Sequence, residues 1–316
     1  MFIYFSKENK ERFMYQLKKI SIPSGETISY REAGSGKTNI LLIHGNQCSS
    51  TIYHDFMKRY EDRAKVYAID LPGFGESSYH NQHLKIEDWA RDVDEFMEVL
   101  GIESAIVVGH SAGGGVGLKL ATDFSKRVDH LVLIASVGVK GFYLPKLDEN
   151  FMPLAGEFAR TYEEVAGHPS MIFVENLIKT KSKEETRNMW DQSLYNLKSP
   201  DPEAYETYID EFFKERCFTD ISAALCQFNI TDEVTYEKGD ESISKISVPV
   251  TWIHGEKDLV VAFAIGENSV KYFPNKIDFI PIKEAGHMVY NDCPDEFYGH
   301  IDKIVDKYLE EEKDAR

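Results

Sequence analysis

The chain has 316 residues, of which 42% are hydrophobic and 28% are charged, a balance typical of a folded globular protein. Acidic residues outnumber basic ones by 53 to 36, and the formal charge of −17 argues against partners such as nucleic acid or anionic lipid. No run approaches the ~18 apolar residues that a membrane span needs.

The N-terminus is not expected to be a signal peptide, because charged residues follow a short apolar start at once. Residues 7–18 have the spacing of a short amphipathic helix. The four cysteines form no CxxC pair and show no metal-ligand spacing with histidine, so we expect free thiols in a reducing compartment and a cytoplasmic protein. Cys48 is interpreted as a packing residue. The sequence is compatible with a homo-oligomer and does not decide the oligomeric state.

The first elements in chain order predict a sheet. Residues 18–34 read as two antiparallel strands joined at Ser24-Gly25. Short apolar strands are expected at 39–45, at 65–77 with a break at Pro72-Gly73, at 105–111 and at 128–136. Residues 86–101 and 112–124 read as the helices between them. Buried strands that alternate with helices are typical of a parallel sheet covered on both faces.

The alternation stops after residue 138. Residues 139–240 contain no convincing buried strand, but they contain aromatic-rich segments with helical spacing. Residues 241–316 resume the strand and helix pattern and end in an amphipathic helix after Pro294. We therefore predict an α/β core in two parts, 1–138 and 241–316, separated by an all-helical insertion at 139–240.

The segment Gly109-His110-Ser111-Ala112-Gly113 matches G-x-S-x-G between an expected strand and an expected helix. In that context the motif is a nucleophile elbow, which presents a serine hydroxyl at the apex of a sharp turn. The residues two before and two after the serine crowd each other, and glycine at both positions removes the clash. The remaining glycines of the helix are expected to let it lie close to the sheet.

A serine hydroxyl needs a base to take its proton and a carboxylate to orient that base. Asp258 and His287 each follow an expected strand in the second part of the core. The chain order Ser, Asp, His is that of α/β-hydrolases. Asp232 and Glu233 are rival acids, but neither lies at an expected strand end, so Asp258 is favoured.

Five motifs occur in order along the chain: LLIHGN, AIDLPGFGESS, VVGHSAGGG, VPVTWIHGEKD and AGHMVYNDCPDEF. In these motifs the chain resembles the capped serine esterases and lactonases of the α/β-hydrolase fold superfamily, over about 20–138 and 240–310. The resemblance implies a mostly parallel central sheet flanked by helices, with the insertion as a lid. It also implies Ser111 as nucleophile, His287 as base and Asp258 as the orienting acid.

An oxyanion hole needs two backbone N–H donors that face the developing negative charge. One is expected from Ala112, directly after the nucleophile. The resemblance implies Asn46 as the other, in the loop after the strand that ends at His44-Gly45. The Asn46 side chain is a candidate for substrate contact, and from the aromatic residues of the insertion we select Tyr143 and Trp190 for the same role.

The remaining polar residues near these motifs are expected to be structural, namely His44, His110, His254 and Asp70. No HExxH or clustered metal-ligand spacing occurs, so neither a metal nor another cofactor is expected.

Serine at the apex, where dehalogenases and epoxide hydrolases of the superfamily carry aspartate, argues against both of those activities. The predicted function is a serine hydrolase of a small, apolar carboxylic ester or lactone. Alternatives that keep the same three residues are C–C bond or amide hydrolysis and a ligand-binding receptor on a hydrolase fold.

Overall fold

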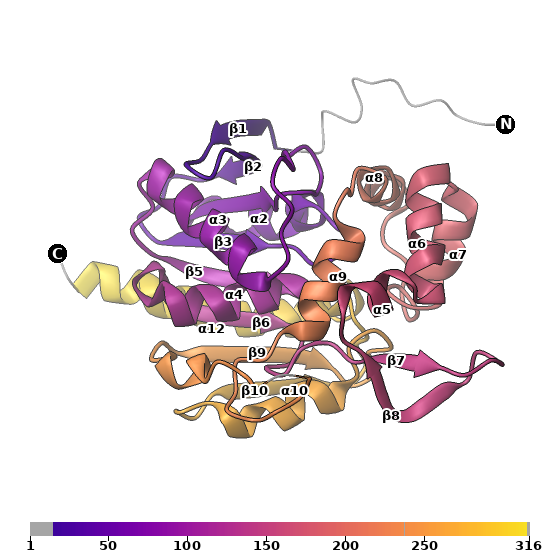
Figure 1. Cartoon of the computed structure of the whole chain (residues 1–316). Coiled ribbons are helices and arrows are strands. Elements are labelled where there is room, and N and C mark those ends of the chain that lie inside the picture. Colours follow the sequence, from indigo (N-terminus) through magenta and orange to yellow (C-terminus); the bar gives the residue numbers. More distant parts are fainter. Residues whose placement is uncertain (1–14, 237, 315–316) are drawn as a thin grey trace, which may run out of the picture.

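The computed structural model describes residues 15–236 and 238–314. Within these residues an eight-stranded sheet has the order β1-β2-β4-β3-β5-β6-β9-β10 (Figure 1). Its strands are β1 (Leu17–Ser21), β2 (Thr27–Ala33), β3 (Asn39–Ile43), β4 (Lys65–Asp70), β5 (Ala105–His110), β6 (Val128–Ile134), β9 (Val250–Gly255) and β10 (Asp278–Ile282). β1, β2 and β4 pair antiparallel, and every pair from β4 to β10 is parallel. The predicted mostly parallel sheet is confirmed.

The N-terminal hairpin is also confirmed. β1 and β2 are joined through a turn in which Gly25 has a φ of 92°, and Ile22 N–H donates to Glu26 O at 2.9 Å. A helix was expected over residues 7–18, and residues 7–14 of it lie outside the described residues. The prediction is wrong at its end, because Leu17 and Lys18 belong to β1.

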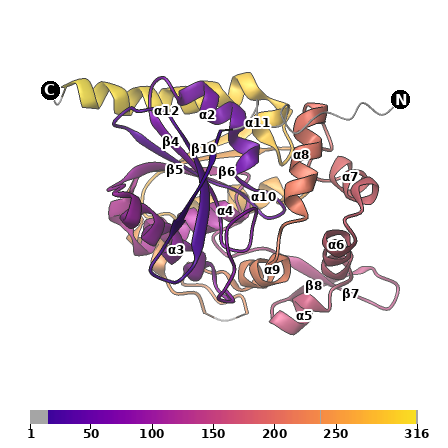
Figure 2. The ribbon, with the colours of Figure 1, turned by 90° about the horizontal axis from the view of Figure 1, so that it is seen from above.

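Helices cover both faces of the sheet because its strands are apolar on both sides. In β3, Leu41 and Ile43 share one hydrophobic cluster with α3 (Ile86–Leu100) and α4 (Ala112–Asp123). Ile40 and Leu42 point the other way and pack with α2 (His54–Tyr60) and α12 (Pro294–Asp314). Figure 2 shows α2 and α12 on one side of the strands and α3 on the other. The alternation follows from the two-residue period of a strand.

The core is completed by short elements, which are α10 (Phe263–Ser269), α11 (Val289–Asp292), η1 (Ser50–Tyr53), η2 (Ser125–Arg127), η3 (Ser242–Lys245) and η4 (Val270–Tyr272). Among the residues that the structure describes, no helix has both the length and the apolar character needed to cross a membrane.

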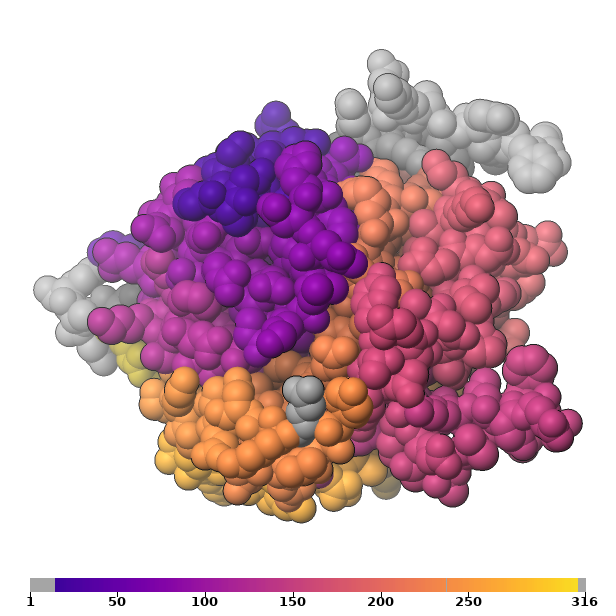
Figure 3. Space-filling model, viewed as in Figure 1, coloured from indigo at the N-terminus to yellow at the C-terminus, as the bar shows by residue number. Residues whose placement is uncertain are grey.

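The sequence predicted an all-helical insertion between β6 and β9, and this prediction is wrong, because the segment also contains strands. Its described residues include the α-helices α5 (Tyr162–Ala166), α6 (Pro169–Thr180), α7 (Lys183–Asp191), α8 (Pro202–Phe212) and α9 (Phe218–Gln227). It also contains a hairpin of β7 (Leu144–Leu147) and β8 (Pro153–Ala159), which projects from the body in Figure 3. β8 is mostly exposed, so it lacks the buried apolar run by which a strand is recognised in sequence.

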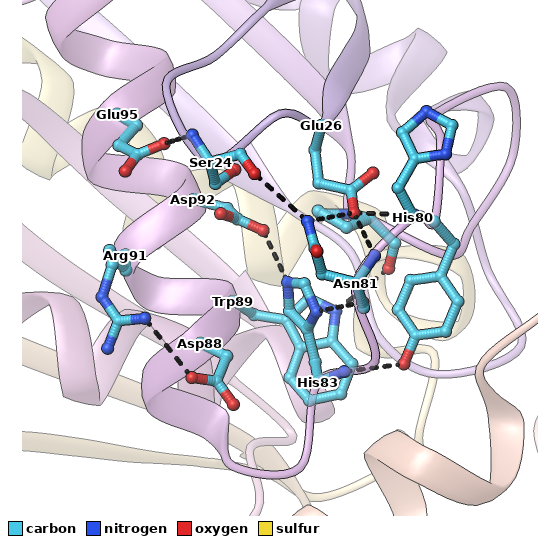
Figure 4. A network of polar contacts seen from close by, with 12 residues as sticks. Ser24, Glu26, His80, Asn81, His83, Asp88, Trp89, Arg91, Asp92 and Glu95 are labelled. Atoms are coloured by element: carbon cyan, nitrogen blue, oxygen red, sulfur yellow. Dashed lines mark hydrogen bonds and ion pairs between the residues drawn. The ribbon is translucent and has the colours of Figure 1, made fainter.

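A buried carboxylate fixes the loop that follows β4. Glu26 Oε1 accepts hydrogen bonds from the N–H groups of His80 and Asn81 at 2.7 and 2.8 Å (Figure 4). In the same network His83 Nε2 contacts Asp92 Oδ2 at 2.6 Å. The loop in turn binds the insertion, since Gly73 O accepts from Arg216 N–H at 2.7 Å. The loop that this network orders is therefore also a contact surface for the insertion at Arg216.

Candidate active site

Ser111 lies between the end of β5 and the start of α4, as the motif predicts. Its φ and ψ are 54° and −117°, a combination that a residue with a side chain rarely adopts. Hydrogen bonds maintain this conformation, because Ser111 N–H donates to Ile134 O at 2.9 Å and Ser111 O accepts from Gly114 N–H at 3.0 Å. Strained backbone held in this way is typical of functional sites.

Both motif glycines have close contacts, but only Gly109 has the predicted one with its partner in the motif, and Gly113 meets the end of β3 instead. A Cβ on Gly109 would lie 2.4 Å from Gly113 O, and a Cβ on Gly113 would lie 2.3 Å from Ile43 O and 2.4 Å from His44 O. Because these neighbours are backbone atoms, they cannot turn away as a side chain can. Gly114 has a packing role, since its Cβ would meet Ser136 Oγ at 2.1 Å.

Gly113→Ala is therefore expected to lower the free energy of unfolding by about 3 kcal/mol or more, through overpacking against backbone. Gly299→Ala in α12 is the matched control, because a Cβ there has no atom within 4 Å. The free energy of unfolding of the control is expected to rise by about 0.5–1 kcal/mol, because alanine has a higher helix propensity than glycine. Chemical denaturation of the three proteins measures both effects. Equal midpoints for Gly113→Ala and the wild type would contradict the packing argument.

Asp258 and His287 lie beyond the ends of β9 and β10, and their side chains meet. His287 Nδ1 is 2.8 Å from Asp258 Oδ2, and only 7% of Asp258 and 1% of His287 are exposed. The other carboxylate oxygen, Oδ1, accepts from the N–H groups of Val260 and Val261 at 2.8 and 2.9 Å. Burial opposes ionisation of Asp258, but the charge and hydrogen bonds of His287 and His254 outweigh it and hold its pKa below the usual range.

His254 also belongs to this cluster, although the sequence did not indicate that it lies beside Asp258. Its Nε2 lies 2.9 Å from Val261 O and 3.3 Å from Asp258 Oδ2, and its Nδ1 accepts from the Trp252 indole at 3.2 Å. Since Nδ1 accepts, Nε2 is the donor, and its nearer acceptor is Val261 O, with the Asp258 carboxylate at the longer distance. His254 and His287 thus contact the same oxygen of Asp258, Oδ2, and His254 helps to hold the carboxylate, which is consistent with the predicted structural role.

Ser111 and His287 line the same cavity, which has a volume of about 110 Å³. Among the described residues no hydrogen bond joins the Ser111 hydroxyl to His287, and such bonds often tighten only when substrate is bound. The apolar lining comes mainly from the insertion and the loop after Asp258 and consists of Ala112, Val137, Phe142, Leu144, Met171, Leu194, Phe218, Leu225, Cys226, Val260 and Val261. The polar lining consists of Asn46, Gln47, Ser111, Ser222 and His287.

Asn46 and Ala112, the two predicted oxyanion donors, both line this cavity. Ala112 is the first residue of α4, where backbone N–H groups have no partner within the helix. Within the described ranges, neither the Asn46 N–H nor the Ala112 N–H has a hydrogen-bond acceptor. Both donors are therefore free to face an oxygen above Ser111.

The Asn46 side chain also lies at the cavity, although it is held by the protein. Its Nδ2 donates to Ser222 Oγ at 3.2 Å, and its Oδ1 accepts from Gln47 N–H at 3.2 Å. The amide thus lines the cavity and is also held by hydrogen bonds within the protein, and its contact with substrate stays a prediction.

The structure places Tyr143 and Trp190 outside the lining of the cavity. Tyr143 faces a separate cavity with Lys140 and Tyr272, whereas its neighbour Phe142 lines the cavity at Ser111. Trp190 is 1% exposed, and its indole N–H donates to Gln47 Oε1 at 2.8 Å. The substrate contact predicted for these two side chains is thus not found in the cavity, because one points to the far side of its segment and the other is buried behind Gln47.

The histidines expected to be structural are held by backbone. His44 Nδ1 lies 2.8 Å from Gly45 O, and its Nε2 accepts from Leu71 N–H at 3.0 Å. His110 contacts His287 O at 3.2 Å, and burial together with the nearby His287 lowers the His110 pKa to about 3. Both rings therefore support the loops around the site without lining the cavity.

The other residues weighed from sequence also lie away from the chemistry. Asp70 accepts from the N–H groups of Ser50 and Glu76 at 2.8 and 3.1 Å, so it orders two loops. The rival acid Glu233 pairs with Lys140 at 2.9 Å on the surface. Cys48 is buried, which raises its pKa to about 12 and makes it an inert packing residue.

Known proteins share this fold and sequence pattern. The chain matches 38% of 111 residues in the uncharacterized protein Rv2715 of Mycobacterium tuberculosis, a match that covers 35% of this chain but only 32% of that protein. It is 24% identical over 281 residues to the uncharacterized hydrolase YugF of Bacillus subtilis, covering 85% of this chain and 90% of that protein. The chain thus spans about a third of the length of the first of these relatives and most of the second.

A solved structure has the same architecture. The esterase EaEST from Exiguobacterium antarcticum superposes with a TM-score of 0.68 at 18% sequence identity, over 93% of this chain and all of that one. The family model described as the alpha/beta hydrolase fold matches residues 38–292, most of the chain. The chain belongs to the alpha/beta hydrolase fold family.

Proposed function

We propose that the protein is a serine hydrolase that cleaves a small carboxylic ester or lactone through an acyl-enzyme intermediate. The observation that carries the proposal is the shared cavity of Ser111 and His287, with His287 Nδ1 held 2.8 Å from a buried Asp258 carboxylate. A carboxylate on Nδ1 leaves Nε2 as the basic nitrogen, which is the tautomer that a serine nucleophile needs.

In the proposed reaction Ser111 Oγ attacks the carbonyl carbon while His287 Nε2 takes the hydroxyl proton. Asp258 stabilises the resulting imidazolium, and the N–H groups of Asn46 and Ala112 donate to the oxyanion. The tetrahedral intermediate then breaks its bond to the leaving oxygen, which receives the proton from His287. Water attacks the acyl-serine by the same steps, and the acid product leaves with Ser111 restored.

The lining supports a short, uncharged acyl group as the substrate part next to Ser111. An apolar cavity of about 110 Å³ is somewhat smaller than a cavity of ~150 Å³ that accepts benzene. Charged groups would lose their hydration there, and the described lining residues include no Asp, Glu, Lys or Arg side chain to pair with them. A lactone fits the same chemistry, because it is a cyclic ester whose leaving oxygen stays attached to the acyl group.

The proposal is tested with p-nitrophenyl esters of increasing acyl length and with lactones of increasing ring size. The wild type is expected to prefer short acyl chains. Met171→Ala, which removes a lining side chain, is expected to shift the ratio of hexanoyl to butyryl hydrolysis by about tenfold toward hexanoyl. Ile172→Ala is the control, because Ile172 is next in α6 but 55% exposed. An unchanged ratio in Met171→Ala would place the acyl group elsewhere.

A further inference from the structure

The loop that carries Asn46 is tied to the insertion at three points. Asn46 Nδ2 donates to Ser222 Oγ on α9, and Gln47 Oε1 accepts from the Trp190 indole on α7. The backbone N–H of Gln47 donates to Glu215 Oε2 at 3.1 Å, in the turn between α8 and α9. The insertion thus contacts both the side chains and the backbone of this loop.

The backbone at this point needs such restraints. Gln47 has a φ of 60°, which a residue with a side chain seldom adopts without support. The preceding peptide is fixed by the core, since His44 Nδ1 contacts Gly45 O at 2.8 Å. Because a trans peptide directs its N–H opposite to its C=O, this contact orients the Asn46 N–H. Glu215 restrains the next peptide, between Asn46 and Gln47.

Glu215 is an unusual residue for this task. It is 4% exposed, and among the described residues its Oε1 has no hydrogen-bond partner. Burial, with a smaller contribution from Glu175, raises its pKa well above the usual range against the opposing effects of Gln47 N–H and Arg216. The Gln47 N–H is thus a hydrogen-bond partner of this buried carboxyl group, which accepts it through Oε2.

We propose that Glu215 is a positioning residue that holds the peptide between Asn46 and Gln47, so that the Asn46 N–H stays directed into the cavity. The inference rests on the proposed serine hydrolase reaction and extends it, because it makes the oxyanion hole depend on the insertion. The insertion then contributes to the rate of the chemical step as well as to the lining of the cavity.

The test compares Glu215→Ala and Glu215→Gln with the wild type on p-nitrophenyl butyrate. Glu215→Ala is expected to lower kcat by about 10- to 100-fold, the range for a displaced donor, with little change in KM. Binding of n-butylboronic acid, which forms a tetrahedral adduct with serine, is expected to weaken by a similar factor. Glu215→Gln is expected to remain within about threefold of the wild type, because its amide oxygen still accepts the N–H.

Glu211→Ala is the matched control, since Glu211 is also a buried glutamate of this region but pairs with Lys214. It is expected to leave kcat nearly unchanged. If Glu215→Ala does not fold, Trp190→Phe serves instead, because it removes the hydrogen bond from the indole N–H to Gln47 Oε1 and keeps an aromatic ring at this position. Its kcat is then expected to fall by about three- to tenfold with KM retained.

The inference is overturned if Glu215→Ala and Trp190→Phe keep the wild-type kcat and boronate affinity, or if Glu215→Gln is as impaired as Glu215→Ala. A parallel loss of stability and of folded protein, with kcat per folded molecule unchanged, would also overturn it. If the wild type itself shows no hydrolysis that depends on Ser111, the proposed function fails, and the two failures are thereby distinguished.

Discussion

Ser111→Ala is expected to lower kcat/KM for p-nitrophenyl butyrate by about 10⁴- to 10⁶-fold, the range for loss of a serine nucleophile. The hydroxyl oxygen is the only heavy atom removed, and alanine keeps the Cβ that serine carries at φ 54°. The Ser111 backbone hydrogen bonds to Ile134 and Gly114 remain. The thermal midpoint is therefore expected to stay close to that of the wild type, so that loss of activity reports chemistry and not folding.

The control is Ser136→Ala, which removes a buried hydroxyl that donates to Val137 O at the end of β6 and does not line the cavity. Steady-state kinetics and thermal unfolding of both variants make the comparison. An activity of Ser111→Ala within about tenfold of the wild type would show that another group performs the attack.

Asp258→Asn is expected to lower kcat by about 10⁴-fold. The amide can still accept the N–H groups of Val260 and Val261 through its oxygen, so the loop is expected to persist. It then presents an NH₂ group to His287, which favours the tautomer with the proton on Nε2 and abolishes its use as a base. The neutral amide also leaves the imidazolium without a counter-charge.

Asp232→Asn is the matched control, because Asp232 is one of the two rival acids in the sequence and is exposed. Its kcat is expected to remain within about twofold of the wild type. The assignment is contradicted if Asp232→Asn loses the activity and Asp258→Asn retains it. Circular dichroism of the two variants checks that both are folded.

The parts of the site that follow from local sequence could be predicted. Gly109 marks the elbow through a local clash, because a Cβ there would meet Gly113 O, whereas a Cβ on Gly113 would meet the backbone at the end of β3. The G-x-S-x-G spacing between a strand and a helix was enough to place the elbow. Asp258 and His287 could be placed because each follows a short apolar strand, and parallel strands deliver their carboxyl ends to one edge of the sheet. The meeting of these two side chains therefore follows from topology.

Side-chain direction in the insertion could not be predicted in this way. Phe142 and Tyr143 are adjacent aromatic residues, yet only Phe142 lines the cavity at Ser111. Trp190 has a position fixed by stacking on Tyr205 and by its bond to Gln47, both contacts between distant segments. Aromatic content shows that the insertion has a core, but not which rings face the substrate.

The hairpin and Glu215 were missed for different physical reasons. β7 and β8 are exposed strands stabilised by a turn in which Asp148 Oδ1 accepts from the N–H groups of Asn150 and Met152, so hydrophobic periodicity is weak there. Glu215 lies in a segment with helical spacing, and the break between α8 and α9 that buries its carboxyl group is a tertiary feature.

The most direct test of the account is to locate the covalent adduct of a fluorophosphonate probe by mass spectrometry. After digestion with trypsin, Ser111 lies in the peptide 92–119, between Arg91 and the cleavage after Lys119. We expect one probe per molecule on Ser111, and none in Ser111→Ala. An adduct on a different residue, or wild-type protein that hydrolyses esters yet takes up no probe, would contradict the proposal that Ser111 is the nucleophile.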